Sequence, residues 1–169
     1  VMSLTAFASE KDAMPISVFK PTGFGRFAIW EKKTAGEKLT PAETEEWSRI
    51  VDRFDTICQR AKEMDIEVLI DGEESWMQDA ADELVSAMMV KYNKDKPVVY
   101  NTLQCYRWDR LEYLKQQHLD AKARGYTLGY KIVRGAYMEK ENKRAQEMGY
   151  PTPICASKQA TDDNFNQVM

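Results

Sequence analysis

The chain has 169 residues, enough for one domain with a hydrophobic core of its own. Its 24 lysines and arginines against 27 aspartates and glutamates give a net charge of −3, so charge offers no argument for binding nucleic acid or an anionic membrane surface. No apolar run approaches the roughly 18 residues that a membrane-spanning helix needs, and no secretory signal peptide is visible.

The amino-terminal part of the chain contains one predicted strand. Residues 1–15 mix alanine, serine, lysine and methionine, which predicts a helix. Ile16-Ser17-Val18-Phe19 is a short β-prone run and predicts the first strand. Residues 21–40 hold three of the eight glycines together with several charges, so we expect a long loop there, with a helical turn around Ile29-Trp30.

A long amphipathic helix follows this loop. In Thr40-Pro41-Ala42-Glu43, the threonine can cap the helix, the proline suits its first position, and the glutamate can close a capping box. The helix should end near Met64. Apolar residues recur at three- and four-residue spacing and predict one buried face: Trp47, Ile50, Val51, Phe54, Ile57, Cys58 and Ala61.

The rest of the chain alternates short apolar runs with helical patterns. Strands are predicted at residues 67–70, 97–102 and 130–133. Helices are predicted around residues 80–91, around residues 111–125, over residues 139–148, and from about Thr161, with Thr161 or Asp162 as its cap.

The order β-α-β-α-β-α-β-α predicts an α/β fold with a parallel sheet. Leu69 precedes Tyr100 by 31 positions, and Tyr100 precedes Lys131 by the same number, a repeat of architecture without a repeat of sequence. A Rossmann fold and a (β/α)8 TIM-barrel-like fold both fit this order. No GxGxxG opens a helix, and polar residues end every strand, which favours the barrel.

A complete barrel needs about 250 residues, so four βα units amount to about half of one. The chain starts at Val1 and stops at Met169 within a predicted helix. We therefore expect residues 1–169 to form the first four βα units of a barrel domain that is truncated at its carboxyl end.

Polar side chains close the predicted strands at Lys20, Asp71, Gln104, Lys131 and Arg134. Any one of them would be ordinary where a chain leaves a sheet, but barrel geometry would bring them together in one pocket. By strict alternation only one of Lys131 and Arg134 would face that pocket, whereas the other would face the helices.

Each of these residues suits a particular contact. Lys20 can hold an anion such as a substrate carboxylate, and Gly72 after Asp71 lets a ligand approach the backbone. Gln104 offers a donor and an acceptor, which suits the imide-like edge of a flavin or a nucleobase. Lys131 and Arg134 can stabilise negative charge on a reduced cofactor or hold a pyrophosphate.

Hydrolytic and metal chemistry are disfavoured. Cys58, Cys105 and Cys155 are far apart, without a CxxC pair, and fit a reducing compartment. The only histidine, His118, lies in a predicted helix and is expected at the surface, and no Ser–His–Asp or Cys–His set is visible. Cofactor-borne redox chemistry needs only binding groups and positioned charge, which the strand ends supply.

In five segments the sequence resembles the proline dehydrogenase family, which includes a domain of the bifunctional proline utilisation A proteins. The resemblance covers residues 14–169 and follows the order of the family's motifs. Its segments are Ile16-Ser17-Val18-Phe19-Lys20, Val68-Leu69-Ile70-Asp71-Gly72-Glu73-Glu74, Asn101-Thr102-Leu103-Gln104-Cys105-Tyr106, Lys131-Ile132-Val133-Arg134-Gly135-Ala136-Tyr137-Met138, and Ser157-Lys158 with Ala160-Thr161-Asp162.

The resemblance implies a barrel that holds FAD at the carboxyl ends of its strands. It implies oxidation of L-proline to Δ1-pyrroline-5-carboxylate, with electrons passed to a membrane quinone. The whole protein would then work in the cytoplasm, at the bacterial inner membrane as a peripheral protein, or at the mitochondrial inner membrane.

The resemblance also assigns roles to residues. Lys20 pairs with the proline carboxylate, Asp71 orders the pocket beside substrate and flavin, and Lys131 lies near the reactive edge of the flavin. Gln104 forms a hydrogen bond with the isoalloxazine ring. The cofactor is lined by Val133, Gly135, Ala136 and Tyr137, with Arg134 as a candidate contact, and its phosphate or adenosine half is reached by Lys158 and Thr161.

The sequence departs from the family because the carboxyl-terminal arginine pair and the later strands are absent. We therefore expect these 169 residues alone not to turn over proline, and expect the exposed edges of a half barrel to cause self-association. Two alternatives stay open. One is another barrel enzyme that uses Lys20 or Lys131 as a Schiff base or anion holder, and the other is a non-catalytic fragment.

Overall fold

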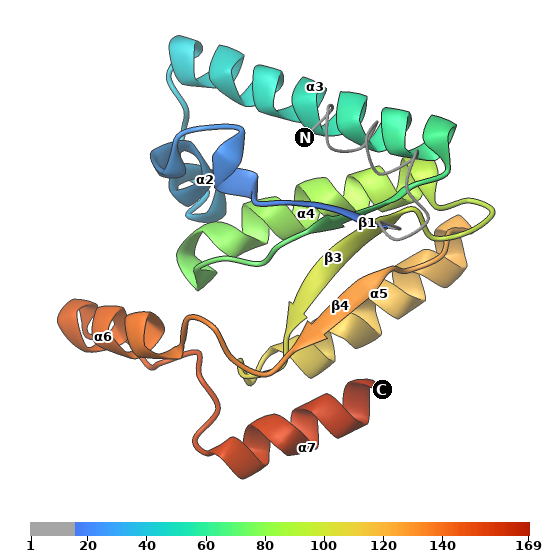
Figure 1. Ribbon diagram of the computed structural model, residues 1–169. Helices are drawn as coiled ribbons and strands as arrows, with labels where there is room; N and C mark the ends of the chain where they lie inside the picture. The colour runs from blue at the N-terminus through green and yellow to red at the C-terminus, as the bar shows by residue number, and fades with distance from the viewer. Residues whose placement is uncertain (1–15) are drawn as a thin grey trace.

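The computed structural model describes residues 16–169, and the helix predicted in residues 1–15 lies outside the described residues. The elements are β1 (Ile16–Phe19), the short 3-10 helix η1 (Pro21–Gly23), α2 (Phe27–Thr34), α3 (Pro41–Met64), β2 (Glu67–Ile70), α4 (Ser75–Tyr92), β3 (Val99–Gln104), α5 (Arg110–Arg124), β4 (Tyr130–Val133), α6 (Met138–Met148) and α7 (Lys158–Val168) (Figure 1). Among these residues, no helix is both long enough and apolar enough to cross a membrane.

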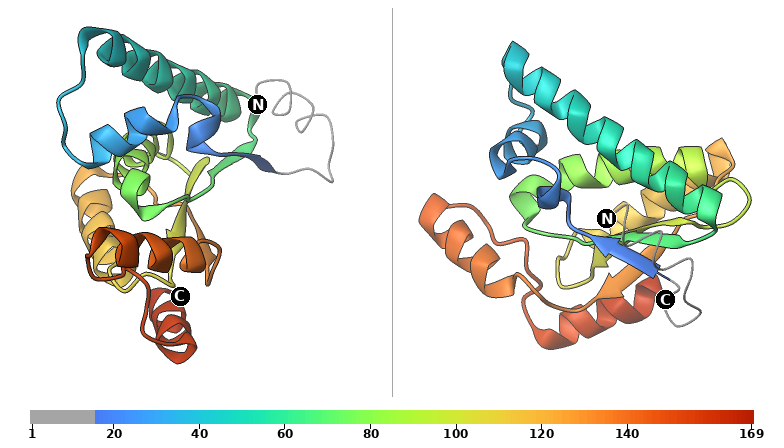
Figure 2. Two further views of the ribbon diagram at one scale, coloured as in Figure 1. Left: turned by 90° about the vertical axis from the view of Figure 1, so that its left-hand side faces the viewer. Right: turned by 45° about the horizontal axis from the view of Figure 1, so that its top comes forward.

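The four strands form one sheet in the order β1-β2-β3-β4, and every neighbouring pair is parallel. Each strand is followed by at least one helix, as the sequence predicts. Figures 1 and 2 show α3 and α4 stacked on one side of the sheet and α6 lying beyond the carboxyl ends of the strands. This is the arrangement of consecutive βα units in a barrel.

The start of α3 confirms the predicted capping box. Thr40 Oγ1 accepts a hydrogen bond from the Glu43 amide at 3.3 Å, and Glu43 Oε2 accepts one from the Thr40 amide at 2.8 Å. At the other end Asp65 adopts a left-handed conformation, with φ of 55°, which ends the helix after Met64 as predicted.

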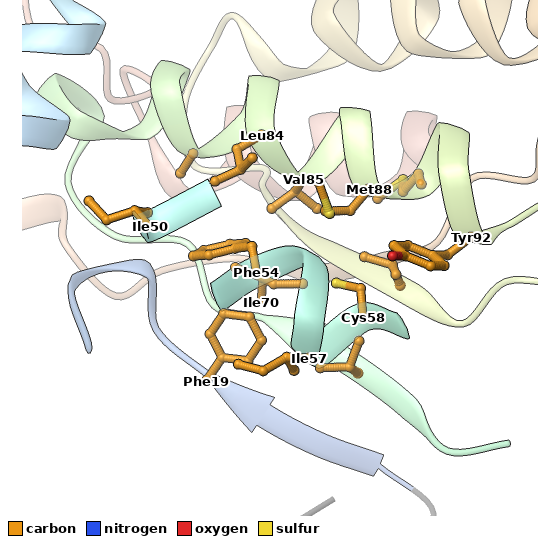
Figure 3. Packing of buried hydrophobic residues seen from close by; sticks show 14 of the residues in the cluster. Phe19, Ile50, Phe54, Ile57, Cys58, Ile70, Leu84, Val85, Met88 and Tyr92 are labelled. Carbon is orange, nitrogen blue, oxygen red and sulfur yellow. The ribbon is translucent and has the colours of Figure 1, made fainter. Parts of the chain in front are cut away.

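The core lies between the helices and one face of the sheet (Figure 3). Phe19 of β1 meets Phe54 of α3 edge to face, with ring centroids 5.1 Å apart. Ile70 of β2 and Leu84 of α4 belong to the same buried cluster. Because successive strand residues point to opposite faces, this packing commits every second residue of each strand to the core.

The opposite face of the sheet is less covered. Val18, the neighbour of Phe19, is 43% exposed, although Phe19 itself is only 6% exposed. Every residue of β4 is half-buried. The side chains on this second face are therefore available to line a site.

Residues 21–40 are more ordered than predicted. The expected loop contains η1 and the eight-residue helix α2, whose Ile29 and Trp30 are both fully buried. Gly25 makes this packing possible, because a Cβ there would lie 2.2 Å from Ile50 Cδ1. The burial depends on packing of α2 against α4 and on ring contacts of Trp30 with Trp47 and Phe54 of α3, so it is not visible in the local sequence.

Two further boundaries differ from prediction. The third strand runs over Val99–Gln104, two residues later than expected, so Gln104 is its last residue. The last helix starts at Lys158, and its cap is Ser157, whose side chain accepts a hydrogen bond from the Ala160 amide at 3.1 Å. Ser157 precedes the two predicted caps, Thr161 and Asp162, by about one helical turn, so that prediction is wrong.

We predict that Thr40→Ala lowers the free energy of unfolding by about 1 kcal/mol, because it leaves an amide at the start of α3 without its acceptor. Urea denaturation followed by circular dichroism measures this loss. The matched control is Thr56→Ala, which removes a hydroxyl bonded to the Asp52 carbonyl within the same helix. An equal loss in both variants would contradict the capping role.

Candidate active site

The register of the sheet places four of its side chains in one row. Thr102 of β3 pairs with Lys131 of β4. Leu69 pairs with Tyr100, and continuing this register by two residues places Asp71 beside Thr102. Phe19 pairs with Ile70, so the next pair is Lys20 and Asp71. Neighbouring residues that are directly paired point to the same face of a pleated sheet. The side chains of the four positions, Lys20, Asp71, Thr102 and Lys131, therefore emerge on one face.

A pocket of about 310 Å³ opens on this face at the carboxyl ends of the strands. It brings together four residues predicted from strand ends and the segment that follows β4. Its lining consists of Lys20, Asp71, Gly72, Thr102, Gln104, Tyr106, Lys131, Val133, Gly135, Ala136 and Tyr137. Ligand sites of α/β barrels lie at this end of the sheet.

Lys131 and Asp71 form an ion pair across the pocket floor, between Lys131 Nζ and Asp71 Oδ1. The lysine side chain is 37% exposed and the aspartate side chain is 25% exposed. The pair is therefore partly shielded from water but open to a ligand. The aspartate thereby fixes the position of the Lys131 ammonium group on one wall of the pocket.

Lys20 supplies a second positive charge. Its Nζ donates to the Tyr137 hydroxyl at 3.3 Å and lies 5.9 Å from the centre of that ring. This hydrogen bond, together with the nearby Glu73 and Asp71 carboxylates, raises the pKa of Lys20. Lys20 is therefore an ammonium ion at neutral pH and attracts an anion such as a carboxylate.

Gln104 has a buried acceptor without a donor. Its Nε2 donates to the Glu73 carbonyl at 2.7 Å and to the Tyr106 hydroxyl at 2.9 Å, whereas its Oε1 has no hydrogen-bond partner. Buried acceptors are nearly always satisfied in native proteins. Gly72 packs against this amide, and a Cβ there would lie 3.2 Å from Gln104 Nε2. The site thus suits a ligand that brings an N–H group to Gln104.

Tyr106 is a pocket residue that the sequence analysis did not single out. Its hydroxyl receives the Gln104 amide and a backbone hydrogen bond from Tyr137, so it connects β3 with the segment after β4. Burial raises the pKa of Tyr106 well above that of an exposed tyrosine, which keeps the hydroxyl protonated. It lies in the turn after β3, two residues beyond Gln104, and the available signal is that it ends the segment 101–106 that carries the family resemblance.

Val133, Gly135, Ala136 and Tyr137 line the pocket at the positions expected from the sequence. Met138, which the resemblance includes, is the first residue of α6 and is not among the lining residues. A Cβ on Gly135 would lie 3.2 Å from Met138 Sδ. The segment 134–137 thus forms the wall that connects β4 to α6.

Arg134, Lys158 and Thr161 lie outside this pocket. Arg134 Nη1 is 3.2 Å from Asp162 Oδ1 of α7, and Lys158 Nζ is 2.5 Å from Oδ2 of the same aspartate. Thr161 is 3% exposed, and its hydroxyl donates to the Ser157 carbonyl at 3.4 Å. Arg134 directly follows the last residue of β4, and its odd spacing from Lys131 places it on the opposite face. Lys158 and Thr161 belong to α7, which Arg134 contacts through Asp162.

A larger cavity, of about 590 Å³, lies between α4 and α5. Arg110 and Asp82 line it and pair at 2.7 Å, and Asp82 also accepts hydrogen bonds from Gln78 and Asn101. These buried groups satisfy one another, so we assign this network to packing of the helices on the sheet. His118 is exposed on α5, as predicted.

A family model for proline dehydrogenase matches residues 4–169. The chain belongs to the proline dehydrogenase family. It is 35% identical over 132 residues to "Proline dehydrogenase 1, mitochondrial" of Drosophila melanogaster, which covers 78% of this chain and 19% of the fly protein. It is 33% identical over 168 residues to "Carbapenem antibiotics biosynthesis protein CarD" of Pectobacterium carotovorum, covering 99% of this chain and 44% of that protein.

Solved structures of proline utilization A share the fold. A variant from Bradyrhizobium japonicum gives a TM-score of 0.78 at 23% identity, covering 97% of this chain and 17% of that one. The protein from Bdellovibrio bacteriovorus inactivated by N-propargylglycine gives a TM-score of 0.76 at 19% identity, covering 97% of this chain and 18% of that one. The likeness confirms the predicted TIM-barrel-like α/β fold. The chain spans less than half the length of these relatives and structures.

We predict that Lys131→Met and Asp71→Asn each change the free energy of unfolding by at most about 1 kcal/mol, because their ion pair is partly exposed. Chemical denaturation measures the change. Phe54→Ala is the comparison variant, with an expected loss of about 3–5 kcal/mol from the core. A loss of that size at Lys131 or Asp71 would give this pair a structural role instead.

Proposed function

We propose that the whole protein oxidises L-proline to Δ1-pyrroline-5-carboxylate with FAD as its cofactor. One observation carries the proposal. A single pocket at the strand ends combines the unpaired Gln104 oxygen with two fixed lysine charges, Lys20 and Lys131. Membership of the proline dehydrogenase family supports the same reaction, since the family is generally flavin-dependent.

The residues of the pocket fit a flavin ring. Gln104 Oε1 would accept the imide N–H, which is the donor that this buried oxygen lacks. Val133, Gly135 and Ala136 offer a flat wall with little side-chain bulk. When bound, the flavin accepts the two electrons that leave the substrate.

The charges of the pocket divide between substrate and cofactor. Lys20 would hold the carboxylate of proline, because it is cationic and faces the pocket next to Tyr137. Lys131 would place positive charge where a reduced cofactor needs stabilisation, and Asp71 orients it. Binding the carboxylate at one fixed point turns binding energy into orientation of the ring.

The predicted contacts of Arg134, Lys158 and Thr161 with the distal half of FAD stay predictions. Their described contacts are with α7, on the far side of β4 from the pocket. A contact with the cofactor would have to extend from the pocket around the carboxyl end of β4.

A Schiff-base enzyme on the same barrel is the less favoured reading. Such an enzyme needs an unprotonated lysine to attack a carbonyl group. The hydrogen bond to Tyr137 and the nearby carboxylates raise the pKa of Lys20, which stabilises that lysine as a cation. Lys131 Nζ is engaged by the Asp71 carboxylate, so it is not a free amine directed at a carbonyl group.

The electron acceptor and the location follow from the same proposal. A membrane quinone would take the electrons, which requires contact of the whole protein with a membrane surface. Relatives from Drosophila melanogaster and Arabidopsis thaliana are named as mitochondrial proteins, and the solved relatives include proline utilization A proteins. A relative from Xenopus laevis is named "Hydroxyproline dehydrogenase", so both imino acids belong in the assay.

Residues 1–169 would form a partial barrel domain within that protein. The four-stranded sheet ends at β1 and β4, and all of β4 is half-buried. Unpaired edges of this kind invite pairing with other strands. In the whole protein they would meet further strands of the barrel, and in the isolated chain they would promote self-association.

We predict that the full-length protein purifies with bound FAD and that adding L-proline bleaches the flavin absorption band. Lys20→Met should raise the KM for proline by about 10- to 100-fold, because it removes a charge-assisted contact with the carboxylate. Steady-state kinetics with a dye acceptor measure the change, with hydroxyproline as a second substrate.

The matched control for Lys20→Met is Lys143→Met, which removes an exposed lysine from α6. Its KM should equal that of the unchanged protein. Colourless protein without flavin, or equal KM values in both variants, would contradict the proposed roles of cofactor and lysine.

We predict that residues 1–169 alone show no turnover of proline in the presence of added FAD, because they supply about half of a barrel of roughly 250 residues. Light scattering of the same sample should show a dimer or a larger species, because within residues 16–169 both edges of the sheet are open. Measurable turnover would contradict the first expectation, and a clean monomer would contradict the second.

A further inference from the structure

Helix α6 is joined directly to one wall of the pocket. Only residues 134–137 separate the end of β4 from the start of α6, and Gly135, Ala136 and Tyr137 of this segment line the pocket. So short a connection cannot move independently of the helix that follows it. Whatever fixes α6 therefore also fixes this wall.

The first turn of α6 carries a buried carboxylate, Glu141, which is 1% exposed. Its Oε1 accepts a hydrogen bond from the Ser75 amide at 2.6 Å, and its Oε2 accepts one from the Ser75 hydroxyl at 2.6 Å. Ser75 is the first residue of α4, and the side chain of its own cap residue, Glu74, makes no capping hydrogen bond. Glu141 therefore caps α4 across 66 residues of chain.

This contact is favourable in both charge and geometry. The amides at the start of a helix lack partners within the helix and carry partial positive charge, so a carboxylate there is stabilised. Lys140 forms an ion pair with Glu74 beside it, and Arg144 Nη2 lies 2.8 Å from Glu31 Oε1 of α2. Lys140 and Glu141 thus attach α6 to the start of α4, and Arg144 attaches it to α2.

The start of α4 belongs to the opposite side of the pocket. Between Asp71 and Ser75 there are only three residues, among them Gly72, which packs on Gln104. Figure 1 shows α6 lying beyond the strand ends, next to the segment that leads from β2 into α4. The bond between Glu141 and Ser75 therefore joins the connection after β2 to the connection after β4.

We propose that Glu141 is a positioning residue for the pocket: its carboxylate, bonded to the first residue of α4, holds the wall 134–137 at the distance from Asp71 and Gln104 that a bound flavin requires. This inference rests on the proposed function. Glu141 is not among the residues that line the pocket, so it would act through Tyr137 and the segment before it.

The test uses the full-length protein stripped of cofactor. Hydrogen exchange followed by mass spectrometry reports on the amides of residues 134–137, and quenching of FAD fluorescence gives the Kd for added FAD. Glu141→Ala should speed exchange in 134–137 by about tenfold and raise the Kd by about tenfold, the size expected when a helix-capping carboxylate is lost.

Glu139→Ala is the matched control, because Glu139 lies in the same turn of α6 but is exposed. It should leave both measurements unchanged. Glu141→Gln keeps the shape of the side chain and one acceptor, so its effects on exchange and on the Kd should lie between those of Glu141→Ala and those of Glu139→Ala. If Glu141→Ala does not fold, Glu141→Gln is the variant that tests the inference.

Two results separate this inference from the proposed function. If the unchanged protein binds no FAD, the proposed cofactor is wrong, whereas the exchange of 134–137 still tests the link through Glu141. If Glu141→Ala lowers the melting temperature but leaves both the exchange of 134–137 and the Kd for FAD as in the Glu139→Ala control, Glu141 only stabilises α4 and the inference is overturned.

Discussion

Parallel hydrogen bonding between neighbouring strands decides which side chains of this protein share a row. The ladder pairs Phe19 with Ile70, Leu69 with Tyr100 and Thr102 with Lys131. A shift of one residue in any pair would turn a strand over and exchange core and pocket side chains. The core prevents such a shift, because Phe19 and Ile70 are buried against the helices on the other face. The hydrophobic packing thus sets the position of the polar row.

The polar row in turn depends on the chain segments around it. Gly72 leaves room for the Gln104 amide, and Tyr106 connects that amide to the backbone of Tyr137. The two lysines are held by different partners, one by Asp71 and the other by a tyrosine hydroxyl. Except for the bond between Gln104 and Tyr106, these contacts join segments that are distant in sequence, so the pocket is a property of the assembled sheet and not of one motif.

The arrangement suits chemistry carried by a cofactor. The described part of the pocket offers two cations, one unpaired acceptor and a wall of small residues. An enzyme with a nucleophile would need a base next to that nucleophile. A flavin enzyme instead needs a fixed ring, a fixed substrate and charge to stabilise the reduced state. Membership of the proline dehydrogenase family and the geometry of the strand ends therefore agree.

Local chemistry in the sequence determined most of the elements and the face on which each strand residue lies. The capping box at Thr40 and the alternation that separates Lys131 from Arg134 need only neighbouring residues, and both are found as predicted. A spacing of 31 predicts the pairing of Leu69 with Tyr100, but β3 and β4 pair Thr102 with Lys131, a step of 29. The difference is two residues, so the side chains stay on the same face.

Tertiary structure alone decided the exact register, the burial of α2, the unpaired oxygen of Gln104 and the capping of α4 by Glu141. Each depends on contacts between segments dozens of residues apart. Periodicity, caps and turn residues act over one or two turns of chain, so they specify which face a residue occupies but not which distant group it meets there.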